Sequence, residues 1–243
     1  MAKINSNVVT GSFGAKVTSR IAAVFIEFRK DGVTSAALLE ALKVAKLQVD
    51  KSTITGTTVK IYPQSVVDLM EICSNFSGAI IGEKVGTKAF IGGTINLTES
   101  GAEQLQKDEY YNVQLTGLPE GVEADLYAID TFHNAASFLS FSPIDVPANA
   151  PKYIDVANAL FIAIPYGKLR SLEATHQNRQ HVRYEADELE HIVKIGNPMT
   201  SNMEGVLTTG PINYYVLPIG QIQEVKLDLL EDGKAILVNR VYS

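Results

Sequence analysis

The chain has 243 residues, of which 46% are hydrophobic and 20% are charged; this composition is ordinary for a globular protein and excludes bulk disorder. Its formal net charge of −6 disfavours a protein that wraps nucleic acid, because phosphate contacts need a surface of Lys and Arg. Residues 1–7 lack the apolar core of a signal peptide, and no apolar run approaches the roughly 20 residues that span a bilayer. We therefore expect the chain to be made in the cytosol.

In chain order, the first half combines short strand patterns with two helix patterns. The strongest strand pattern covers residues 21–28, where apolar residues occupy both faces, as in a strand that is covered on both sides. Thr34 and Ser35 are suited to cap a helix over residues 36–45. The remaining strand patterns of this half lie at residues 8–10, 47–49, 57–61, 88–91, 94–97, 111–115 and 126–129.

One unit, a short strand that runs directly into an amphipathic helix, occurs twice, at residues 59–72 and 182–195. Pro63 is expected in the first turn of the first helix, because the missing N–H of proline would be unpaired there anyway. An apolar stripe with i, i+3, i+4, i+7 spacing runs along this helix and comprises Val66, Leu69, Met70 and Cys73. The stripe recurs 123 residues later (189 − 66) as Leu189, Ile192 and Val193.

Other strand patterns of the two halves match in the same order. Residues 23–28 correspond to 159–164 at an offset of 136 (159 − 23), and residues 113–115 correspond to 225–227 at an offset of 112 (225 − 113). The offset shrinks along the chain, as expected if the second copy has shorter loops. The order predicts an internal duplication. The alternative is a single larger β-domain whose strands merely share a composition.

Two β-rich copies, each with about eight short strands and an inserted helix, predict an all-β chain with a few inserted helices. The expected fold is two tandem antiparallel jelly-roll β-sandwiches. We expect the N-terminal jelly roll over residues 1–133 and the C-terminal jelly roll over residues 134–243.

The paired strands 23–28 and 159–164 and the paired units 59–72 and 182–195 also carry a family resemblance. The chain resembles the double-jelly-roll major capsid proteins of tailless, membrane-containing icosahedral bacteriophages. Its compact size is most similar to the coat proteins of the PM2-like and Flavobacterium-infecting phages. The resemblance covers nearly the whole chain and is one of pattern, because these families have no diagnostic short motif.

The resemblance implies a viral structural protein that self-assembles, as pseudo-hexagonal trimers, into an icosahedral shell over an internal membrane. The implied partners are other copies of the chain, penton or minor capsid proteins and the viral membrane, with no direct nucleic-acid binding. The implied location is the virion capsid, after synthesis in the host cytoplasm. Two alternatives are a vertex, penton or spike protein of the same kind of virus and a carbohydrate-binding β-sandwich protein.

No sequence pattern specifies a reaction. His176 and His181 are five residues apart, which fits neither a helical metal-binding pair nor a Cys/His zinc spacing. The Glu188-x-x-His191 step occurs once, whereas di-iron bundles need a second such motif. Residues 82–88 miss the spacing of a phosphate loop and are interpreted as a β-connection. We therefore predict no catalytic residue, cofactor or metal site, and we expect that the chain is not an enzyme.

Cys73 and the tyrosine pairs are interpreted structurally. Cys73 is the single cysteine, which excludes an internal disulfide, and its place on the apolar stripe favours a buried apolar residue over a reactive thiol. The pairs 110–111 and 214–215 are tyrosines. They are expected either at an interface, where tyrosine is enriched, or as half-buried strand residues.

Overall fold

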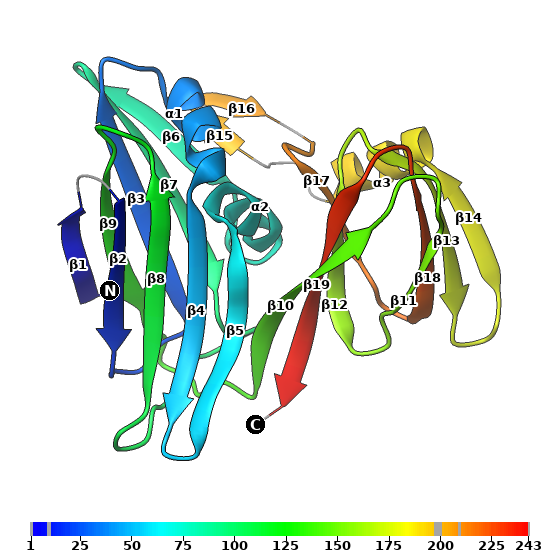
Figure 1. The fold of residues 1–243 in the computed structure, drawn as a ribbon, viewed down its shortest axis with the longest axis horizontal. Helices are drawn as coiled ribbons and strands as arrows, with labels where there is room; N and C mark the ends of the chain where they lie inside the picture. The colour runs from blue at the N-terminus through cyan, green and yellow to red at the C-terminus, as the bar shows by residue number, and fades with distance from the viewer. Residues whose placement is uncertain (1, 9–10, 197–200, 209, 243) are drawn as a thin grey trace. The chain divides into compact units, whose positions relative to one another are not determined.

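Strands make up most of the computed structural model, which describes residues 2–8, 11–196, 201–208 and 210–242 (Figure 1). The predicted all-β class with a few inserted helices is confirmed. The chain divides into two units. The first consists of residues 1–140, 199–208 and 241–243, and the second of residues 141–198 and 209–240. Among the described helices, none is long and apolar enough to cross a membrane.

The first unit is a sandwich of two sheets. Its strands are β1 (Ala2–Val8), β2 (Gly11–Val17), β3 (Ala23–Asp31), β4 (Lys46–Thr53), β5 (Gly56–Ser65), β6 (Ile80–Val85), β7 (Lys88–Asn96), β8 (Tyr110–Leu118) and β9 (Glu123–Ile129). One sheet contains the strand order β1-β9-β3-β7-β6, and the other contains β2-β8-β4-β5. The predicted strand at residues 8–10 falls partly on positions 9–10, which lie outside the described residues.

The core of the first unit follows from alternation along its central strands. In β3, Val24, Ile26 and Phe28 are fully buried, while the residues between them are partly exposed. The opposite sheet contributes Leu47 and Val49 of β4, which are also fully buried. Successive side chains of a strand point to opposite faces, so each sheet buries one apolar face against the other.

The helix α1 (Ser35–Ala41) lies between β3 and β4, where the sequence predicts it. Thr34 caps it as predicted, because its Oγ1 accepts the backbone N–H of Ala37 at 3.2 Å. The α-helix ends earlier than predicted, at Ala41, and continues as a 3₁₀ turn over Leu42–Val44.

The helix α2 (Val66–Ser77) lies between β5 and β6 and ends at Gly78, which has a φ of +93°. The side chain of Met70 lies directly over Gly93 of β7, where an added Cβ would be 2.6 Å from Met70 Sδ. The predicted apolar stripe is confirmed, since at most 1% of each of its residues is exposed: Val66, Leu69, Met70 and Cys73.

The second unit is also built from two sheets. Its strands are β10 (Ser137–Val146), which begins in the first unit, β11 (Lys152–Asp155), β12 (Ala159–Pro165), β13 (Leu169–His176), β14 (His181–Glu185), β17 (Tyr214–Pro218), β18 (Ile222–Leu229) and β19 (Gly233–Tyr242). One sheet contains β10-β19-β12-β17, and the other is β11-β18-β13-β14. The helix α3 (Ala186–Gly196) follows β14.

The two units share one strand order. β10-β19-β12-β17 takes the place of β1-β9-β3-β7, and β11-β18-β13-β14 takes the place of β2-β8-β4-β5. The matched sequences 23–28 and 159–164 lie in β3 and β12, and 113–115 and 225–227 lie in β8 and β18. These strands occupy corresponding places. Agreement in spatial order as well as in composition favours a duplication over a single larger β-domain.

The strand–helix junction differs from the sequence prediction. Pro63 lies in β5 and not in the first turn of a helix. The helix α2 starts at Val66, because Ser65 Oγ accepts the N–H of Asp68 at 3.5 Å and caps it. In the second unit α3 starts at Ala186, so the two helices begin 120 residues apart (186 − 66) and not 123. The first copy extends its strand through residues 63–65.

A hairpin from the second half of the chain belongs to the first unit. β15 (Ser201–Met203) pairs in parallel with β6, and β16 (Val206–Thr208) pairs with β15. The predicted division into residues 1–133 and 134–243 places this hairpin in the C-terminal domain, whereas residues 199–208 group with the first unit, and the main boundary lies inside β10, after Ser140. The physical reason is that β6 has a side with unpaired backbone groups, which β15 satisfies.

Contacts with α1 and β6 hold the hairpin in place. The carboxylate of Glu204 accepts the backbone N–H of Ser35 at 2.9 Å and its hydroxyl at 2.7 Å. The N–H of Glu204 donates to the carbonyl of Gly82 at 2.6 Å. Met203 covers Gly82 so closely that an added Cβ would lie 2.3 Å from Met203 Sδ and 2.9 Å from Ser35 Cβ. A glycine at position 82 is therefore what allows the hairpin to dock.

Gly82→Ala is expected to lower the free energy of unfolding by about 1–3 kcal/mol, the usual cost of overpacking, and to speed hydrogen exchange in β15. The matched control is Gly14→Ala, because the nearest atom to an added Cβ there is 3.7 Å away; it is expected to leave stability unchanged or slightly higher. Urea denaturation with amide exchange measures both. Equal stability and equal β15 protection in the two variants would contradict this packing.

Candidate functional site

A partly buried ionic cluster lies near the start of β8 in the first unit. Lys51 of β4 and Tyr111 of β8 are register partners, and Glu103, on the connection between β7 and β8, contacts both. Lys51 Nζ is 2.6 Å from Glu103 Oε1 and 3.5 Å from Glu109 Oε2. The hydroxyl of Tyr111 donates to the second oxygen of Glu103. Four polar groups thus form one connected set.

The electrostatics of this cluster fix its protonation. Burial lowers the pKa of Lys51, but the hydrogen bond to Glu103 and the charges of Glu103 and Glu109 outweigh it and raise that pKa above its ordinary value. Burial, together with the charge of Glu103, raises the pKa of Tyr111. Burial lowers the pKa of nearby Lys60, and the negative charge of Glu103 offsets only part of this decrease. At neutral pH, Lys51 is therefore charged and Tyr111 is protonated.

The cluster is suited to fastening a loop. The backbones of Glu103 and Ile21 also form two hydrogen bonds, with N···O distances of 3.2 and 2.8 Å. Both backbone and side-chain contacts therefore hold the connection at residues 97–109 in place. Lys51, Glu103 and Tyr111 are engaged by one another, and we interpret them as structural. Sequence reasoning missed this cluster, because its members are far apart in the chain and share no motif.

Tyr111→Phe is expected to cost about 1–3 kcal/mol of stability at neutral pH, because it leaves an oxygen of buried Glu103 without its donor. Tyrosines of the unfolded chain lose their proton near pH 10, whereas the folded protein holds the Tyr111 proton to higher pH. The stabilisation is therefore complete below about pH 10 and is lost as the pH rises above it. The pKa of Lys51 is also raised in the folded protein, so its deprotonation adds a further loss of stability as the pH rises.

Urea titrations between about pH 8 and about pH 11 test this dependence. The decline in stability at alkaline pH should be shallower in Tyr111→Phe than in the parent protein. Tyr62→Phe is the control, since Tyr62 is 47% exposed, and it should keep the parent slope. A parent protein whose stability is flat across this range contradicts the assignment.

The histidines are not brought together into a metal site. His181 Nδ1 is 3.1 Å from Thr175 Oγ1 and 3.9 Å from Glu173 Oε1. Glu188 accepts the N–H of Glu185 at 3.0 Å, as a capping residue at the start of α3 does. Across residues 2–8, 11–196, 201–208 and 210–242, no group of three or more His, Cys, Asp or Glu side chains could hold a metal ion.

Two further sequence features are structural. Residues 82–88 form the end of β6, a turn at Gly86 with a φ of +62°, and the start of β7, so the predicted β-connection is a hairpin. Of the tyrosine pairs, Tyr111 and Tyr215 are 1% and 3% exposed. These two are core residues, which excludes them as surface anchors in this fold.

Cys73 is buried, as predicted. Its Sγ accepts the backbone N–H of Asn96 at 3.4 Å. Burial raises the pKa of the Cys73 thiol to about 12, although the Asn96 N–H opposes the rise. The thiolate is the reactive form of cysteine, so this residue packs as a small apolar side chain.

The Cys73 thiol should be inert in the folded protein. With a pKa of about 12, only about one part in ten thousand is thiolate at pH 8. An aromatic disulfide reagent at pH 8 should give no fast reaction with native protein and one thiol equivalent in about 6 M guanidinium. Rapid labelling of native protein would show that the site is open.

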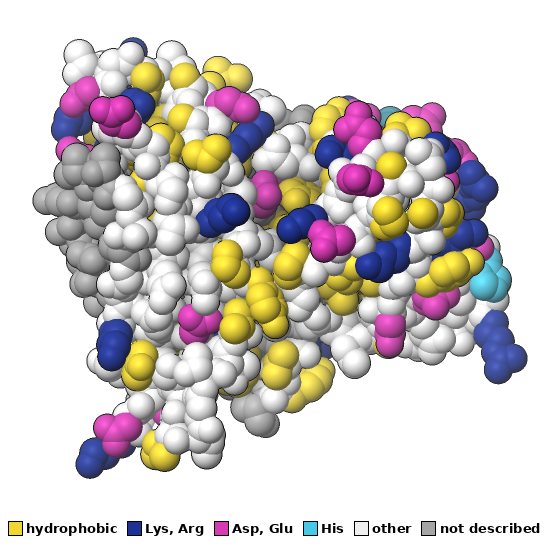
Figure 2. All heavy atoms as spheres, viewed as in Figure 1, with side chains coloured by type: hydrophobic (Ala, Val, Ile, Leu, Met, Phe, Trp, Pro, Cys, Tyr) yellow, Lys and Arg dark blue, Asp and Glu magenta, His cyan; other side chains and the backbone are white. Residues whose placement is uncertain are grey.

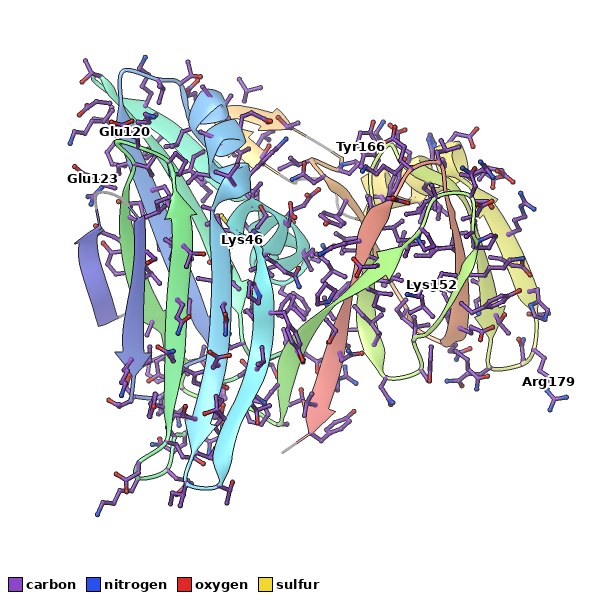
Figure 3. The ribbon with its side chains drawn as sticks, viewed as in Figure 1. Lys46, Glu120, Glu123, Lys152, Tyr166 and Arg179 are labelled. Carbon is purple, nitrogen blue, oxygen red and sulfur yellow. The ribbon has the colours of Figure 1, made fainter. Side chains whose placement is uncertain are left out.

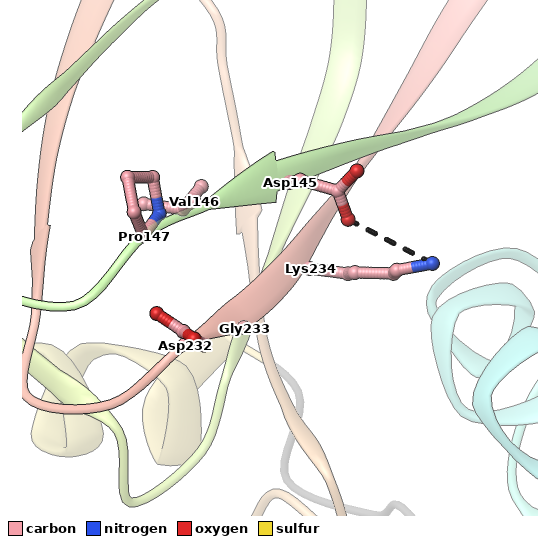
Figure 4. Close-up of a pocket in the computed structure, with 6 residues that line it drawn as sticks. All are labelled: Asp145, Val146, Pro147, Asp232, Gly233 and Lys234. Atoms are coloured by element: carbon pink, nitrogen blue, oxygen red, sulfur yellow. Dashed lines mark ion pairs between the residues drawn. The ribbon is translucent and has the colours of Figure 1, made fainter.

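A surface hollow of about 430 Å³ lies beside the end of β10 in the second unit (Figure 4). Asp145 and Lys234 form an ion pair of 3.7 Å there, and Asp232 accepts the N–H of Ala148 at 2.8 Å. These charged side chains are exposed, so water and salt screen them and the pair contributes little. We interpret this hollow as a solvated surface feature.

Exposed apolar side chains gather at the hairpin edge of the first unit, defined here as Ile81, Leu207 and the strand β16. Ile81 and Leu207 both pair with Asn202 in register, so they share one face of the sheet, and they are 57% and 60% exposed. β16 is the last strand of its sheet. Within the described residues, its outer backbone groups face no further strand. Such edges are suited to contacts with another protein.

Charges are mixed over the surface. On the face seen in Figure 2, Lys and Arg side chains are interspersed with Asp and Glu, without a continuous basic patch. Figure 3 shows Arg179, which has a φ of +63°, at the tip of the turn between β13 and β14 in the second unit, with its side chain pointing away from the sheet. The mixed charges agree with the net charge of −6 and not with a nucleic-acid track on this face.

No protein-family model and no curated protein matches the chain. Among solved structures, it is similar to a chain of the Sputnik virophage determined by cryo-EM, with a TM-score of 0.41 and 10% identity over 98% of this chain and 84% of that one. It is also similar to a Bacillus subtilis oxalate decarboxylase, with a TM-score of 0.25 and 6% identity over 98% of this chain and 77% of that one. For the PBSX exported protein XepA the TM-score is 0.22, with 9% identity over 98% of this chain and 85% of that one. Similarities this low assign no function.

Proposed function

We propose that this chain is a double-jelly-roll major capsid protein, the structural subunit of an icosahedral shell. The observation that carries the proposal is the repeated strand order, β1-β9-β3-β7 with β2-β8-β4-β5 and then β10-β19-β12-β17 with β11-β18-β13-β14. Eight antiparallel strands in two four-stranded sheets, linked as two Greek keys, are the arrangement of a jelly roll. The repetition supports two tandem jelly rolls.

Two further features support the proposal. Each unit inserts a helix, α2 or α3, directly after its fifth strand in this order, as the sequence resemblance to the capsid proteins of membrane-containing phages implies. The hairpin edge also supports self-association, because Ile81 and Leu207 are exposed there and, within the described residues, the outer side of β16 pairs with no further strand.

The finer form of the proposal follows the resemblance. The subunit forms pseudo-hexagonal trimers that tile a shell over an internal membrane, in a PM2-like or Flavobacterium-phage-like virion. Its contacts are other copies, penton or minor capsid proteins and the membrane, it does not bind nucleic acid directly, and it catalyses no reaction. A vertex, penton or spike protein of such a virus is the alternative with the same β-domains.

Light scattering on purified protein tests the proposal. The expected result is a trimer of about 79 kDa, three times the 26.4 kDa of the chain, or larger shells visible by electron microscopy, held by extensive interfaces. Leu207→Lys is expected to reduce assembly by placing a charge on the hairpin edge, whereas Thr55→Lys, in the exposed turn after β4, should not. A stable monomer that binds glycans at micromolar strength contradicts the capsid role.

A further inference from the structure

The second unit contains an apolar cavity that the capsid role does not use. Its volume is about 120 Å³. Both sheets and α3 line it, and most of its wall consists of Ile162, Leu172, Leu189, Leu217, Ile219 and Val225. An engineered apolar cavity of about 150 Å³ in another protein stays dry and binds benzene. A space of this size and lining is suited to a small apolar group.

The cavity adjoins a surface hollow at β14 and α3. Tyr184 of β14 and Ile192 of α3 line both the cavity and a larger surface hollow of about 630 Å³. Ile192 is 43% exposed, although the sequence stripe predicts that it is buried. The same two side chains therefore border the inner and the outer space. We take this shared border as the entrance through which a linear molecule would reach the cavity.

The two copies of the helix explain why this space exists. In the first unit Met70 of α2 fills the space over Gly93, and the whole stripe is at most 1% exposed. In the second unit only Leu189 and Val193 of the described α3 side chains are buried. A helix that buries fewer large side chains leaves part of the sandwich interior unfilled.

Charges at the entrance select the head group of a ligand. The hollow is lined by Arg183, Asp187, Glu188 and His191, beside Tyr184. The guanidinium of Arg183 is already 2.9 Å from a carboxylate oxygen of Glu185. Two carboxylates, of Asp187 and Glu188, therefore remain at the entrance against one paired cation. A further negative charge there is disfavoured by like-charge repulsion, to an extent that water and salt reduce because Asp187 and Glu188 are exposed.

We propose that this cavity binds the end of an unbranched alkyl chain whose head group, neutral or cationic, stays in the hollow. At about 30 Å³ for each water-sized group, the 120 Å³ of the cavity encloses about four carbon atoms. Each enclosed methylene strengthens binding about fourfold. Affinity should therefore rise with chain length and level off once the cavity is full.

Methyl NMR on the full chain, titrated with 1-alcohols of increasing length and with hexyltrimethylammonium and hexanoate, tests the site. The expected result is saturable shifts of the Leu172 and Ile219 methyls, with none at Ile26 in the first-unit core. Hexanol and hexyltrimethylammonium should bind at least about threefold more tightly than hexanoate. Shifts that never saturate, or that are equal at Ile26, would overturn the site. Equal binding of hexanoate would overturn the head-group selection.

Two variants separate binding from misfolding. Ile192→Phe narrows the entrance and should weaken hexanol binding at least about tenfold while the methyl spectrum of the first unit is unchanged. Ile54→Phe is the matched control, because Ile54 is likewise exposed, at 82%, but lies in the first unit and outside the hairpin edge; it should bind as the parent does. Unaltered binding in Ile192→Phe would overturn the proposed entrance.

The alkyl chain has two sources, a free amphiphile or a membrane lipid, and flotation with phosphatidylcholine vesicles distinguishes them. Co-flotation that Ile192→Phe abolishes assigns the chain to a lipid. Saturable hexanol binding without co-flotation assigns it to a free amphiphile. The test is independent of assembly, because hexanol binding is measured on the chain in any oligomeric state, so failure of the capsid role would leave this site intact.

Discussion

Burial of one apolar face per sheet is the constraint on which the rest of the fold depends. Side chains alternate across a strand, so Val24, Ile26 and Phe28 of β3 can be buried together only if a second sheet faces them. The same requirement recurs in the second unit, where Ile162 and Leu227 belong to opposite sheets and to one core. Two sheets that face each other in each unit satisfy it with one strand order, used twice.

Polar contacts hold in place two of the segments that connect the strands. Glu103 ties the connection between β7 and β8 to Lys51 and Tyr111. Glu204 ties the hairpin to the start of α1. Removing one partner from such a buried or partly buried set leaves a polar group without its hydrogen bond. We therefore interpret these two clusters as structural.

The exposed hairpin edge and the apolar cavity that α3 lines are the features that suit binding. The hairpin edge presents Ile81 and Leu207 together with the outer side of β16, which suits association between copies. The cavity reflects the different fit of the two helices to the interiors that they cover. α2 buries its whole stripe, whereas α3 leaves Ile192 at the surface.

The sequence by itself determined the elements whose signal is local: the existence of the strands β3 and β12, the Thr34 cap of α1 and the stripe of α2. It also indicated the duplication, because matched strands keep their order along the chain. Only the tertiary structure decided the placement of residues 201–208, since three-residue strands have no periodicity and their partner, β6, is far away in sequence. The same holds for the Glu103 cluster and for Ile192, because pairing and exposure depend on neighbours that local patterns do not specify.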